Sequence, residues 1–476
     1  MARDKDSDAG RTIDRRGFLL GGSAAAMGAA LAGCAHGPSP AASVAPTQPI
    51  AETPVKAEAK EEAKGIKRYR VLGRTGFKVS DLALGCGRIS EANVVRFAYD
   101  QGVNYFDLAE VYSNGESERQ IGEVMPSLDR KKIFITTKLK VNPDDTEDTI
   151  RDRFAKCQAR MKTDYVDALY MHNPEKVATL THDGFHKAVA RLKSEGRLRH
   201  AGLSSHGPRG KAGESMEKIL CAATEDGRFD LMLLVYNFLN QAEGDTILKA
   251  CRAKNIGTTA MKVTPGVLTV EPYNPANPSM AHAMAIQQAM AKGSNHDEAV
   301  AQLQKRLRED EEKSAKERPK LEPFLKRHNL ATQAQINQAG IQWVLGNPDM
   351  HTVCVSMADF DLVEKTIPLS GTQLSREAAA LLEAFKAGPG RDYCRHGCDD
   401  CADACPHGLP VSTIMRYAYY FHLQGREKYA MGKYAALGKR NASRCADCEA
   451  PCLGACPHGV RTQANLLTAH ALLSFT

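Results

Sequence analysis

The chain contains few aromatic residues and no long hydrophobic run. Phe, Trp and Tyr make up 6% of its 476 residues, with 1 Trp among them. No uninterrupted apolar run reaches the roughly 18 residues that a membrane-spanning helix needs. Charge of one sign is also scarce, because 63 basic residues are nearly balanced by 56 acidic ones and no Lys/Arg block occurs. We therefore do not expect nucleic acid as a partner.

Cysteine is too sparse overall for a disulfide scaffold, at 14 residues in the whole chain. The remaining composition, 43% hydrophobic and 25% charged, is typical of globular proteins, and the length allows two or three domains. The cysteines are unevenly placed, however, because eight of them lie between Cys394 and Cys456. This concentration predicts a metal site near the C-terminus rather than scattered buried thiols.

Residues 1–34 have the order of features found in export signals. Arg15 and Arg16 precede a weakly apolar Gly/Ala stretch at 21–32, and Leu-Ala-Gly then leads to Cys34. The segment resembles a twin-arginine (Tat) signal ending in a lipobox, in which the cysteine is lipidated. Cleavage nearby without a lipid is the alternative. The resemblance predicts export by the Tat route and a lipid anchor in a membrane, as in a periplasmic or cell-envelope lipoprotein.

Residues 35–66 are first Pro/Ala/Ser-rich and then Lys/Glu/Ala-rich, a composition that cannot bury a core and predicts a flexible linker. Beyond it, short apolar runs alternate with longer helical patterns. The eight candidate strands are Leu82–Gly85, Val103–Phe106, Ile133–Thr137, Val166–Met171, His200–Ser204, Leu231–Tyr236, Gly257–Met261 and Thr352–Ser356.

Eight strand-then-helix units over roughly 300 residues predict an α/β fold, a (β/α)8 TIM barrel, at 67–387. A doubly wound sheet is the alternative, but it usually has fewer strands. An insertion at about 265–325 precedes the last strand and includes a mixed-charge stretch at 306–320. That stretch predicts a solvated helix, with a lid or partner surface as the alternative. Residues 388–476 remain for a second, small and mainly helical domain.

Four polar residues follow the ends of neighbouring candidate strands, where barrel enzymes carry their chemistry. They are Asp107, Tyr112, Lys138 and His172. A lysine ammonium beside a tyrosine lowers the pKa of the phenol, and an aspartate can orient that lysine. Tyr112 could then give a proton to a carbonyl oxygen, to which His172 donates a second hydrogen bond.

These residues stand in motifs that resemble the aldo-keto reductases. The matching segments are Tyr69–Ser80, Phe106-Asp-Leu-Ala-Glu-Val-Tyr112, Ser117-Glu118, Thr137-Lys138 and Met171-His172. The resemblance implies a catalytic tetrad of Tyr112, Lys138, Asp107 and His172. It also implies a nicotinamide cofactor, NAD(P)H, and a small carbonyl or alcohol substrate.

The cofactor-binding residues implied by this resemblance match the family less closely. Ser204 and Ser205 stand where the family has a Ser-Asn pair, and Leu233 replaces its usual glutamine, shortly before Tyr236 and Asn237. The stretch at 356–365, where relatives carry basic residues for a 2′-phosphate, contains three acidic residues and one lysine. Acidic residues at that position would repel a 2′-phosphate.

The eight C-terminal cysteines form two similar sets. The first is Cys394, Cys398, Cys401 and Cys405; the second is Cys445, Cys448, Cys452 and Cys456; each ends in Ala-Cys-Pro-His-Gly. Four closely spaced thiolates followed by proline are typical of [4Fe-4S] clusters, with zinc or disulfides as the alternatives.

This segment resembles two-cluster ferredoxins, in which the fourth cysteine of each set binds the other cluster. The resemblance implies one cluster on Cys394, Cys398, Cys401 and Cys456, and the other on Cys445, Cys448, Cys452 and Cys405. Each set has one longer gap than the common pattern. The mature chain as a whole resembles aldo-keto reductases that carry a C-terminal ferredoxin-like domain.

Two classes of function agree with these features. The first is an exported oxidoreductase that interconverts a carbonyl and an alcohol with a nicotinamide cofactor, linked to two [4Fe-4S] clusters and to a redox partner protein. The second is an electron-transfer iron–sulfur lipoprotein whose barrel is a non-catalytic binding or docking module.

Overall fold

The computed structural model describes residues 65–208, 212–266, 275, 286–287, 289–291, 293–315, 333–446 and 448–474. Arg15, Arg16 and Cys34 therefore lie outside the described residues, as do most of the linker and about half of the predicted insertion. Residues 62–476 cluster as one unit. Among the described helices, none combines the length and the apolarity required to cross a membrane.

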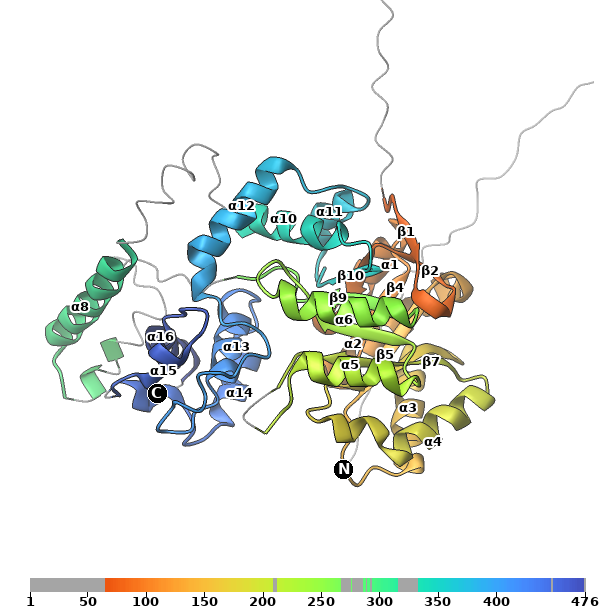
Figure 1. The fold of residues 1–476 in the computed structure, drawn as a ribbon, viewed down its shortest axis with the longest axis horizontal. Helices are drawn as coiled ribbons and strands as arrows, with labels where there is room; N and C mark the ends of the chain where they lie inside the picture. Colours follow the sequence, from red (N-terminus) through yellow and green to blue (C-terminus); the bar gives the residue numbers. More distant parts are fainter. Residues whose placement is uncertain are drawn as a thin grey trace, which may run out of the picture. The chain divides into compact units, whose positions relative to one another are not determined.

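Eight parallel strands close into a barrel (Figure 1). They are β3 (Leu82–Gly85), β4 (Tyr105–Asp107), β5 (Phe134–Leu139), β6 (Val166–His172), β7 (Leu198–Ser205), β8 (Leu231–Val235), β9 (Gly257–Met261) and β10 (Thr352–Val355). The last strand closes the ring, since Val353 of β10 is paired with both Leu82 of β3 and Ala260 of β9. The predicted (β/α)8 barrel is confirmed, and every candidate strand overlaps an observed one.

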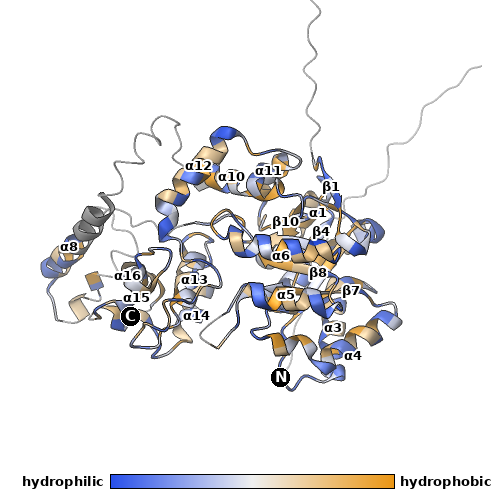
Figure 2. Cartoon of the chain, in the orientation of Figure 1, coloured by the Kyte–Doolittle hydropathy of each residue, from blue (hydrophilic) through white to orange (hydrophobic). Residues whose placement is uncertain are grey.

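The helices between the strands surround this barrel. They are α1 (Ala92–Asp100), α2 (Glu116–Val124), α3 (Glu147–Met161), α4 (Asp183–Ser194), α5 (Met216–Asp226), α6 (Gln241–Ala253), α10 (Gln333–Leu345) and α11 (Phe360–Thr366). Side-chain oxygens cap several of them; for example, Thr146 accepts from the amide of Thr149 at the start of α3. The helices carry both hydrophilic and hydrophobic residues, as expected for elements with one buried face (Figure 2).

A short antiparallel hairpin precedes the barrel and was not among the predicted strands. It consists of β1 (Tyr69–Val71) and β2 (Lys78–Ser80). Its turn lies against the start of β9, because a Cβ added to Gly73 would come within 2.3 Å of the amide nitrogen of Gly257. Strands of three residues give too weak an apolar alternation to be recognised from sequence.

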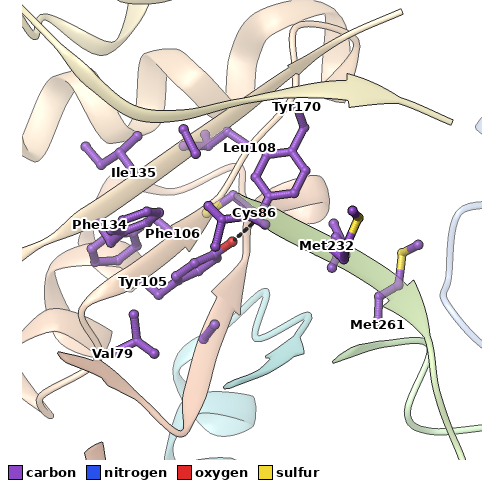
Figure 3. Close-up of a cluster of buried hydrophobic side chains, with 14 of the residues drawn as sticks. Val79, Cys86, Tyr105, Phe106, Leu108, Phe134, Ile135, Tyr170, Met232 and Met261 are labelled. Carbon is purple, nitrogen blue, oxygen red and sulfur yellow. Dashed lines mark hydrogen bonds between the residues drawn. The ribbon is translucent and has the colours of Figure 1, made fainter. Parts of the chain in front are cut away.

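Aromatic side chains fill part of the barrel interior (Figure 3). The rings of Tyr105 and Phe134 stack with centroids 5.4 Å apart, and the hydroxyls of Tyr105 and Tyr170 are hydrogen-bonded at 3.1 Å. Each such fully buried side chain contributes about 1.5–3 kcal/mol through loss of hydrated apolar surface. This packed layer supports the strand ends on which the polar residues lie.

Helix α12 (Arg376–Ala387) leads into a smaller helical domain with its own core. Its helices are α13 (Val411–His422), α14 (Glu427–Ala435), α15 (Pro451–Ala455) and α16 (Thr462–Leu473). The core combines aliphatic residues of α13 and α16 with the thiols of Cys401, Cys445 and Cys452. This agrees with the predicted small, mainly helical second domain.

The two cysteine sets have matching backbone turns. After each fourth cysteine the chain forms the same left-handed turn, with φ of +60° at Gly408 and +66° at Gly459. The amides of these glycines donate to the carbonyls of Cys405 and Cys456 at 3.1 and 3.2 Å. Because a positive φ favours glycine, the repeated glycine has a structural reason in both halves.

Most of the described residues of the insertion belong to α8 (His296–Ala315). The helix begins near the middle of the predicted insertion and continues into its mixed-charge stretch. The side chains beyond residue 305 lie outside the described residues. The predicted choice between a solvated helix and a lid is therefore not tested.

Candidate active site and cysteine sites

Three of the four predicted tetrad residues are hydrogen-bonded to one another through Lys138 at the C-terminal end of the barrel. Its ammonium nitrogen donates to Asp107 Oδ2 at 2.7 Å, to the carbonyl of Leu108 at 2.6 Å and to the hydroxyl of Tyr112 at 3.2 Å. Lys138 is fully buried and Asp107 is 4% exposed. The other oxygen of Asp107 accepts a hydrogen bond from Thr136 at 3.1 Å. This network fixes both the charge and the position of the lysine.

Burial raises the pKa of the Tyr112 hydroxyl, and Asp107 raises it further, whereas Lys138 lowers it. The net effect is a raised pKa. The contribution of Lys138 therefore has the expected direction but does not outweigh burial. Burial alone would lower the pKa of Lys138, but Asp107 and Tyr112 outweigh that effect and raise it. The tyrosine is consequently protonated and the lysine charged near neutral pH.

His172 is the fourth predicted residue and lies beside Tyr112. Their rings are 6.2 Å apart between centroids and meet edge-on. The ring of His206 lies 6.3 Å beyond that of His172. All three side chains are only partly buried, so a small molecule can reach them from solvent. The structure therefore brings all four predicted tetrad residues together, with His206 next to them.

Two buried polar atoms beside this group have no protein partner. They are Ser204 Oγ, at the end of β7, and Asn173 Nδ2, directly after β6. Asn173 is 6% exposed, has a left-handed backbone with φ of +51°, and accepts from the amide of His206 at 2.6 Å through Oδ1. A buried polar atom without a partner costs about 1–3 kcal/mol. A ligand with both a donor and an acceptor, such as a carboxamide, fits these two atoms.

Tyr236 and Asn237, predicted to bind the cofactor, already have protein partners. The Tyr236 hydroxyl donates to Asp245 at 2.6 Å and accepts from Asn347 at 2.7 Å. Asn237 donates to the carbonyl of Lys262 at 2.9 Å and accepts from the amide of Leu239 at 2.9 Å. Tyr236 therefore links the barrel wall to its helices, and Asn237 fixes the loops after β8 and β9. These contacts give no support to a cofactor-binding role for either residue.

The remaining predicted cofactor residues have different environments. Ser205 is fully buried and accepts from the amide of Gly207 at 3.2 Å, and Leu233 is part of the barrel wall. After β10, a surface hollow is lined by Asp359, Phe360, Asp361, Leu362 and Lys365. Lys365 already lies 3.7 Å from the carboxylate of Asp361. The charge in this hollow therefore disfavours a 2′-phosphate.

Four cysteines from both sets line one cavity in the C-terminal domain. They are Cys394, Cys398, Cys401 and Cys456. The rest of the wall consists of the apolar residues Val411, Met415, Pro457 and Val460 and the polar residues Arg395, His458 and Thr462. Burial and the neighbouring thiols of Cys394, Cys456 and Cys398 raise the pKa of Cys401 to about 12. The grouping is the one that the ferredoxin resemblance implied. Four thiols around an apolar cavity suit a metal centre that draws off their protons.

The other four cysteines are also mutual neighbours. Burial, followed by the thiols of Cys405, Cys452 and Cys448, raises the pKa of Cys445 to about 12. The side chain of Gln463 holds this loop by donating to the carbonyls of Cys445 at 2.8 Å and Cys448 at 2.7 Å. None of the cysteines in the described residues forms a disulfide. The donor sets therefore fit two four-thiolate metal centres, for which zinc remains an alternative to iron–sulfur.

A second group with metal-ligand chemistry overlaps the first cysteine set. Ligand atoms of Cys398, Asp400 and His458 lie within 4.8 Å of one another. The Cys398 thiol and Asp400 Oδ2 are 3.4 Å apart. Two hard or borderline ligands beside one thiolate suit zinc better than an iron–sulfur cluster. This group shares Cys398 with the first four-thiol group, so the two sets of ligands cannot be filled independently.

The first cysteine loop, which carries Cys394 and Cys398, contacts the loops at the C-terminal end of the barrel. A Cβ on Gly207, after β7, would lie 2.3 Å from the Cα of Gly397. Arg395 is buried and donates through Nε to the carbonyl of Leu239, after β8, at 3.2 Å. Tyr419 of α13 donates to the carbonyl of Thr264, after β9, at 3.2 Å. The cysteine domain therefore adjoins the end of the barrel that carries the tetrad.

Sequence reasoning missed three groups around the site: Asn173, Lys262 and His396. Each can be recognised only from its position in the structure, since a lone asparagine, lysine or histidine carries no spacing signal. One local signal existed for Asn173, which directly follows the predicted His172 at a strand end. The other two belong to segments more than 130 residues apart in sequence.

The barrel, with a buried Lys–Asp pair bonded to a tyrosine at its C-terminal end, defines an α/β-barrel protein of the oxidoreductase type. The model of the aldo/keto reductase family matches residues 86–387, more than half of the chain. The chain therefore belongs to the aldo/keto reductase family. The match ends at the last residue of α12, before the cysteine domain.

Individual relatives align over parts of the barrel. D-threo-aldose 1-dehydrogenase of Pseudomonas sp. is 26% identical over 200 residues, 36% of this chain and 58% of that protein. A probable voltage-gated potassium channel subunit beta of Arabidopsis thaliana is 35% identical over 124 residues, 23% of this chain and 38% of that protein. The chain thus spans about 40–60% of the length of these relatives.

Among solved structures, an aldo-keto reductase from Bacillus halodurans aligns with part of this chain. The holo form of an enzyme from Bacillus halodurans has a TM-score of 0.47 and 18% identity, covering 69% of this chain and 99% of that one.

Proposed function

We propose that the barrel interconverts a carbonyl and an alcohol with a nicotinamide cofactor. The main supporting observation is that the Lys138 ammonium donates hydrogen bonds to both Asp107 and Tyr112 in a buried site. Membership of the aldo/keto reductase family supports the reaction class, and the unpaired atoms of Ser204 and Asn173 support a bound carboxamide. The acidic hollow after β10 supports NADH over NADPH.

The residues of the chain supply the proton chemistry of this reaction. Lys138 donates to the Tyr112 oxygen, so the phenolic proton is left to point at a substrate oxygen. Tyr112 gives that proton to the carbonyl oxygen in reduction and removes it from the alcohol in oxidation. His172 donates to the same oxygen as charge develops on it. A bound nicotinamide cofactor would supply or accept the hydride.

Carbonyl reduction by the anaerobically purified full chain tests this proposal. NADH, NADPH and a reduced low-potential dye are compared as donors over a panel of aldehydes and ketones. We expect turnover with NADH above NADPH, because Asp359 and Asp361 repel the extra phosphate. Absence of turnover with every donor would contradict the proposal.

We further propose that the eight C-terminal cysteines bind two [4Fe-4S] clusters and that these exchange electrons with a redox partner protein. Support comes from the two four-thiol groups, one of which lines a cavity. The thiols of Cys401 and Cys452, one from each group, are electrostatic neighbours, so the two centres adjoin. Iron and acid-labile sulfide analysis tests this; zinc alone would contradict it.

For the N-terminus we propose export by the Tat route and lipidation at Cys34. Support lies in the order of Arg15, Arg16, the Gly/Ala stretch and the cysteine. Replacing both arginines by lysine should leave precursor in the cytoplasm, and Cys34→Ala should release the protein from membranes. An unchanged distribution in both variants would contradict the proposal.

A second function is favoured by one observation. Leu233 replaces the glutamine that the family uses for its cofactor, and Tyr236 and Asn237 are already bonded within the protein. A barrel that has lost its cofactor would serve as a docking module for an electron-transfer lipoprotein. Extraction of nucleotide from the purified protein distinguishes the two functions, because the second predicts none.

A further inference from the structure

The segment at 426–444 of the cysteine domain has an excess of exposed cations. It covers α14 and the loop that leads to the second cysteine set (Figure 1). It contains six basic residues and one acidic residue, Glu427. All the basic side chains are exposed except that of Arg426, which is partly buried. Together with Tyr429 they form what we call the cationic surface: Arg426, Lys428, Lys433, Lys439, Arg440 and Arg444.

The cations of this surface are not neutralised by ion pairs. Among the ion pairs of the described residues, none includes any of the six. Many cations on the barrel helices, by contrast, pair with an acid one helical turn away, as in Arg96–Asp100 at 2.9 Å and Lys187–Asp183 at 2.7 Å. Unpaired charges of one sign on one segment create a positive potential that attracts an acidic partner.

Tyr429 gives the cationic surface an aromatic centre. Its side chain is 43% exposed. The guanidinium of Arg426 lies 4.0 Å from the centroid of its ring, and the ammonium of Lys433 lies 5.7 Å from it. Tyrosine and arginine are enriched at protein–protein interfaces, where such anchors contribute much of the binding energy.

The other side of α14 is already buried. Ala430, Met431 and Tyr434 pack into the core of the cysteine domain. A helix that binds a membrane surface needs a free apolar face to insert, and in α14 the domain core occupies that face. These contacts favour a protein over a membrane as the occupant.

The cationic surface continues to the second cysteine set. The hydroxyl of Tyr434 accepts from the amide of Ala442 at 2.8 Å, so the chain folds back onto α14 before it reaches the cysteines. Arg444 is exposed, and the next residue is Cys445, which is 5% exposed. A protein bound to this surface would therefore lie next to the second set.

The first cysteine set has different surroundings. Asp400 and Asp403 are exposed on its loop and would repel an acidic protein. Gly397 of this loop packs against Gly207 of the barrel, where an added Cβ would find the other glycine within 3 Å. The loop of the second set has Glu449 as its exposed acid among the described residues, against six cations before it. One sequence pattern thus produces a set that faces the barrel and a set that adjoins exposed cations.

We propose that the cationic surface is the docking site of an acidic redox protein, which exchanges electrons with the chain at the second cysteine set. Each encounter moves one electron, so a carrier that reduces the chain is itself oxidised. Charge complementarity speeds such encounters, and electron-transfer complexes typically have small interfaces. The inference rests on the proposed clusters and states where their partner binds. It also orders the two sets, because the second faces the partner and the first faces the barrel.

Binding of two carriers of opposite charge tests the proposal. Calorimetry is carried out on the full chain, purified anaerobically, with all proteins oxidised so that no electron moves. The probes are a plant-type ferredoxin, which is strongly acidic, and cytochrome c, which is strongly basic. We expect ferredoxin to bind at least about 10-fold more tightly at low salt. The difference should vanish near 1 M salt, where the Debye length is about 3 Å.

Two variants separate charge from anchoring. The triple variant Lys428→Gln, Lys433→Gln and Lys439→Gln should weaken ferredoxin binding about 10-fold or more and reduce its salt dependence. Tyr429→Ser should weaken binding by about 10-fold and leave the salt dependence unchanged, because the anchor carries no charge.

A matched control removes the same charge from the barrel. Lys131→Gln, Lys156→Gln and Lys249→Gln replace three exposed lysines that lie outside the cationic surface. Its net charge equals that of the triple variant, and its ferredoxin binding should be that of the wild type. Iron content and the visible spectrum, unchanged in every variant, show that the cysteine domain is intact.

Equal binding of ferredoxin and cytochrome c, or wild-type affinity in the triple variant, would overturn the proposal. Phosphatidylglycerol vesicles test the other occupant. If the triple variant loses vesicle binding and keeps ferredoxin binding, the surface belongs to an anionic membrane and the proposal is wrong. Iron and sulfide analysis judges the clusters separately. Zinc with ferredoxin binding retained refutes the clusters and the electron exchange but not the docking surface; iron without charge-dependent binding refutes the docking surface alone.

Discussion

The barrel and the cysteine domain differ in what fills their interiors. The barrel core is a continuous cluster of aliphatic and aromatic side chains, among them Tyr105, Phe134 and Tyr170. The core of the cysteine domain is smaller and includes the thiols of Cys401, Cys445 and Cys452. Apolar burial alone can stabilise the first, whereas the second encloses polar groups whose pKa values are raised by burial. The comparison predicts that the smaller domain, unlike the barrel, needs a metal bound by its cysteines to be stable.

Metal removal is expected to produce the largest difference in stability between the two domains. The intact protein should hold about eight iron and eight sulfide per chain. Extraction of the metal should unfold the cysteine domain, because metal binding energy is then folding energy, and leave the barrel folded. Limited proteolysis with circular dichroism measures both regions. Cys251→Ala in α6, a buried thiol outside the two sets, is the control and should keep the full iron content. A cysteine domain that stays folded without metal would contradict the comparison.

The Tyr112→Phe variant tests whether the reaction depends on the barrel alone. The change keeps the ring and removes the proton donor, so turnover should fall by about 10²–10⁴-fold. The cluster spectrum should not change. Steady-state kinetics with the best carbonyl substrate provides the measurement. Tyr236→Phe removes a hydroxyl bonded only within the protein and serves as the matched control with near-normal turnover. Equal activity of both variants would show that the tetrad is not used.

Lys138→Met tests the buried Lys138–Asp107 pair at the C-terminal end of the barrel. It leaves Asp107 buried without its cation and should lower the free energy of unfolding by about 3–5 kcal/mol. The double variant with Asp107→Asn should recover part of that loss in urea titrations. Because Lys138 lowers the pKa of Tyr112, its removal should also shift the alkaline rise of alcohol oxidation to higher pH. An unchanged profile would indicate that Tyr112 is not the titrating group.

His351 predicts a pH dependence confined to the opposite end of the barrel. Burial lowers the pKa of His351 to about 4, and its Nδ1 accepts from the amide of Thr258 at 3.1 Å. Between pH 6.5 and 4 the unfolded chain binds a proton that the folded barrel does not, so stability falls as pH falls. The loss is at most about 3 kcal/mol. His351→Asn should flatten this part of the curve in denaturant titrations; an unchanged slope would exclude His351 as its source.

The tetrad and the cysteine sets could be found in the sequence because local rules apply to them. Parallel strands present their C-terminal ends at one end of a barrel, so polar residues at the ends of β4, β5 and β6 must lie near one another. Closely spaced cysteines reach one centre for a similar reason. The cofactor residues were harder, because Tyr236 and Asn237 follow a strand end and yet bond to Asp245 and Lys262. Strand ends specify position, whereas the direction of a side chain depends on its neighbours.

The sequence by itself therefore determined the barrel, the end of it that carries the tetrad and the eight candidate thiol ligands, since periodicity and spacing are properties of the chain. Tertiary structure alone decided that the loop with the first cysteines lies against the end of the barrel, where Arg395 donates to the carbonyl of Leu239, because these two residues come from separate domains. It also decided that burial raises the pKa of the Tyr112 hydroxyl by more than Lys138 lowers it. Both outcomes depend on how much water is excluded and on which loops meet, and those quantities arise only once the packed chain brings distant segments together.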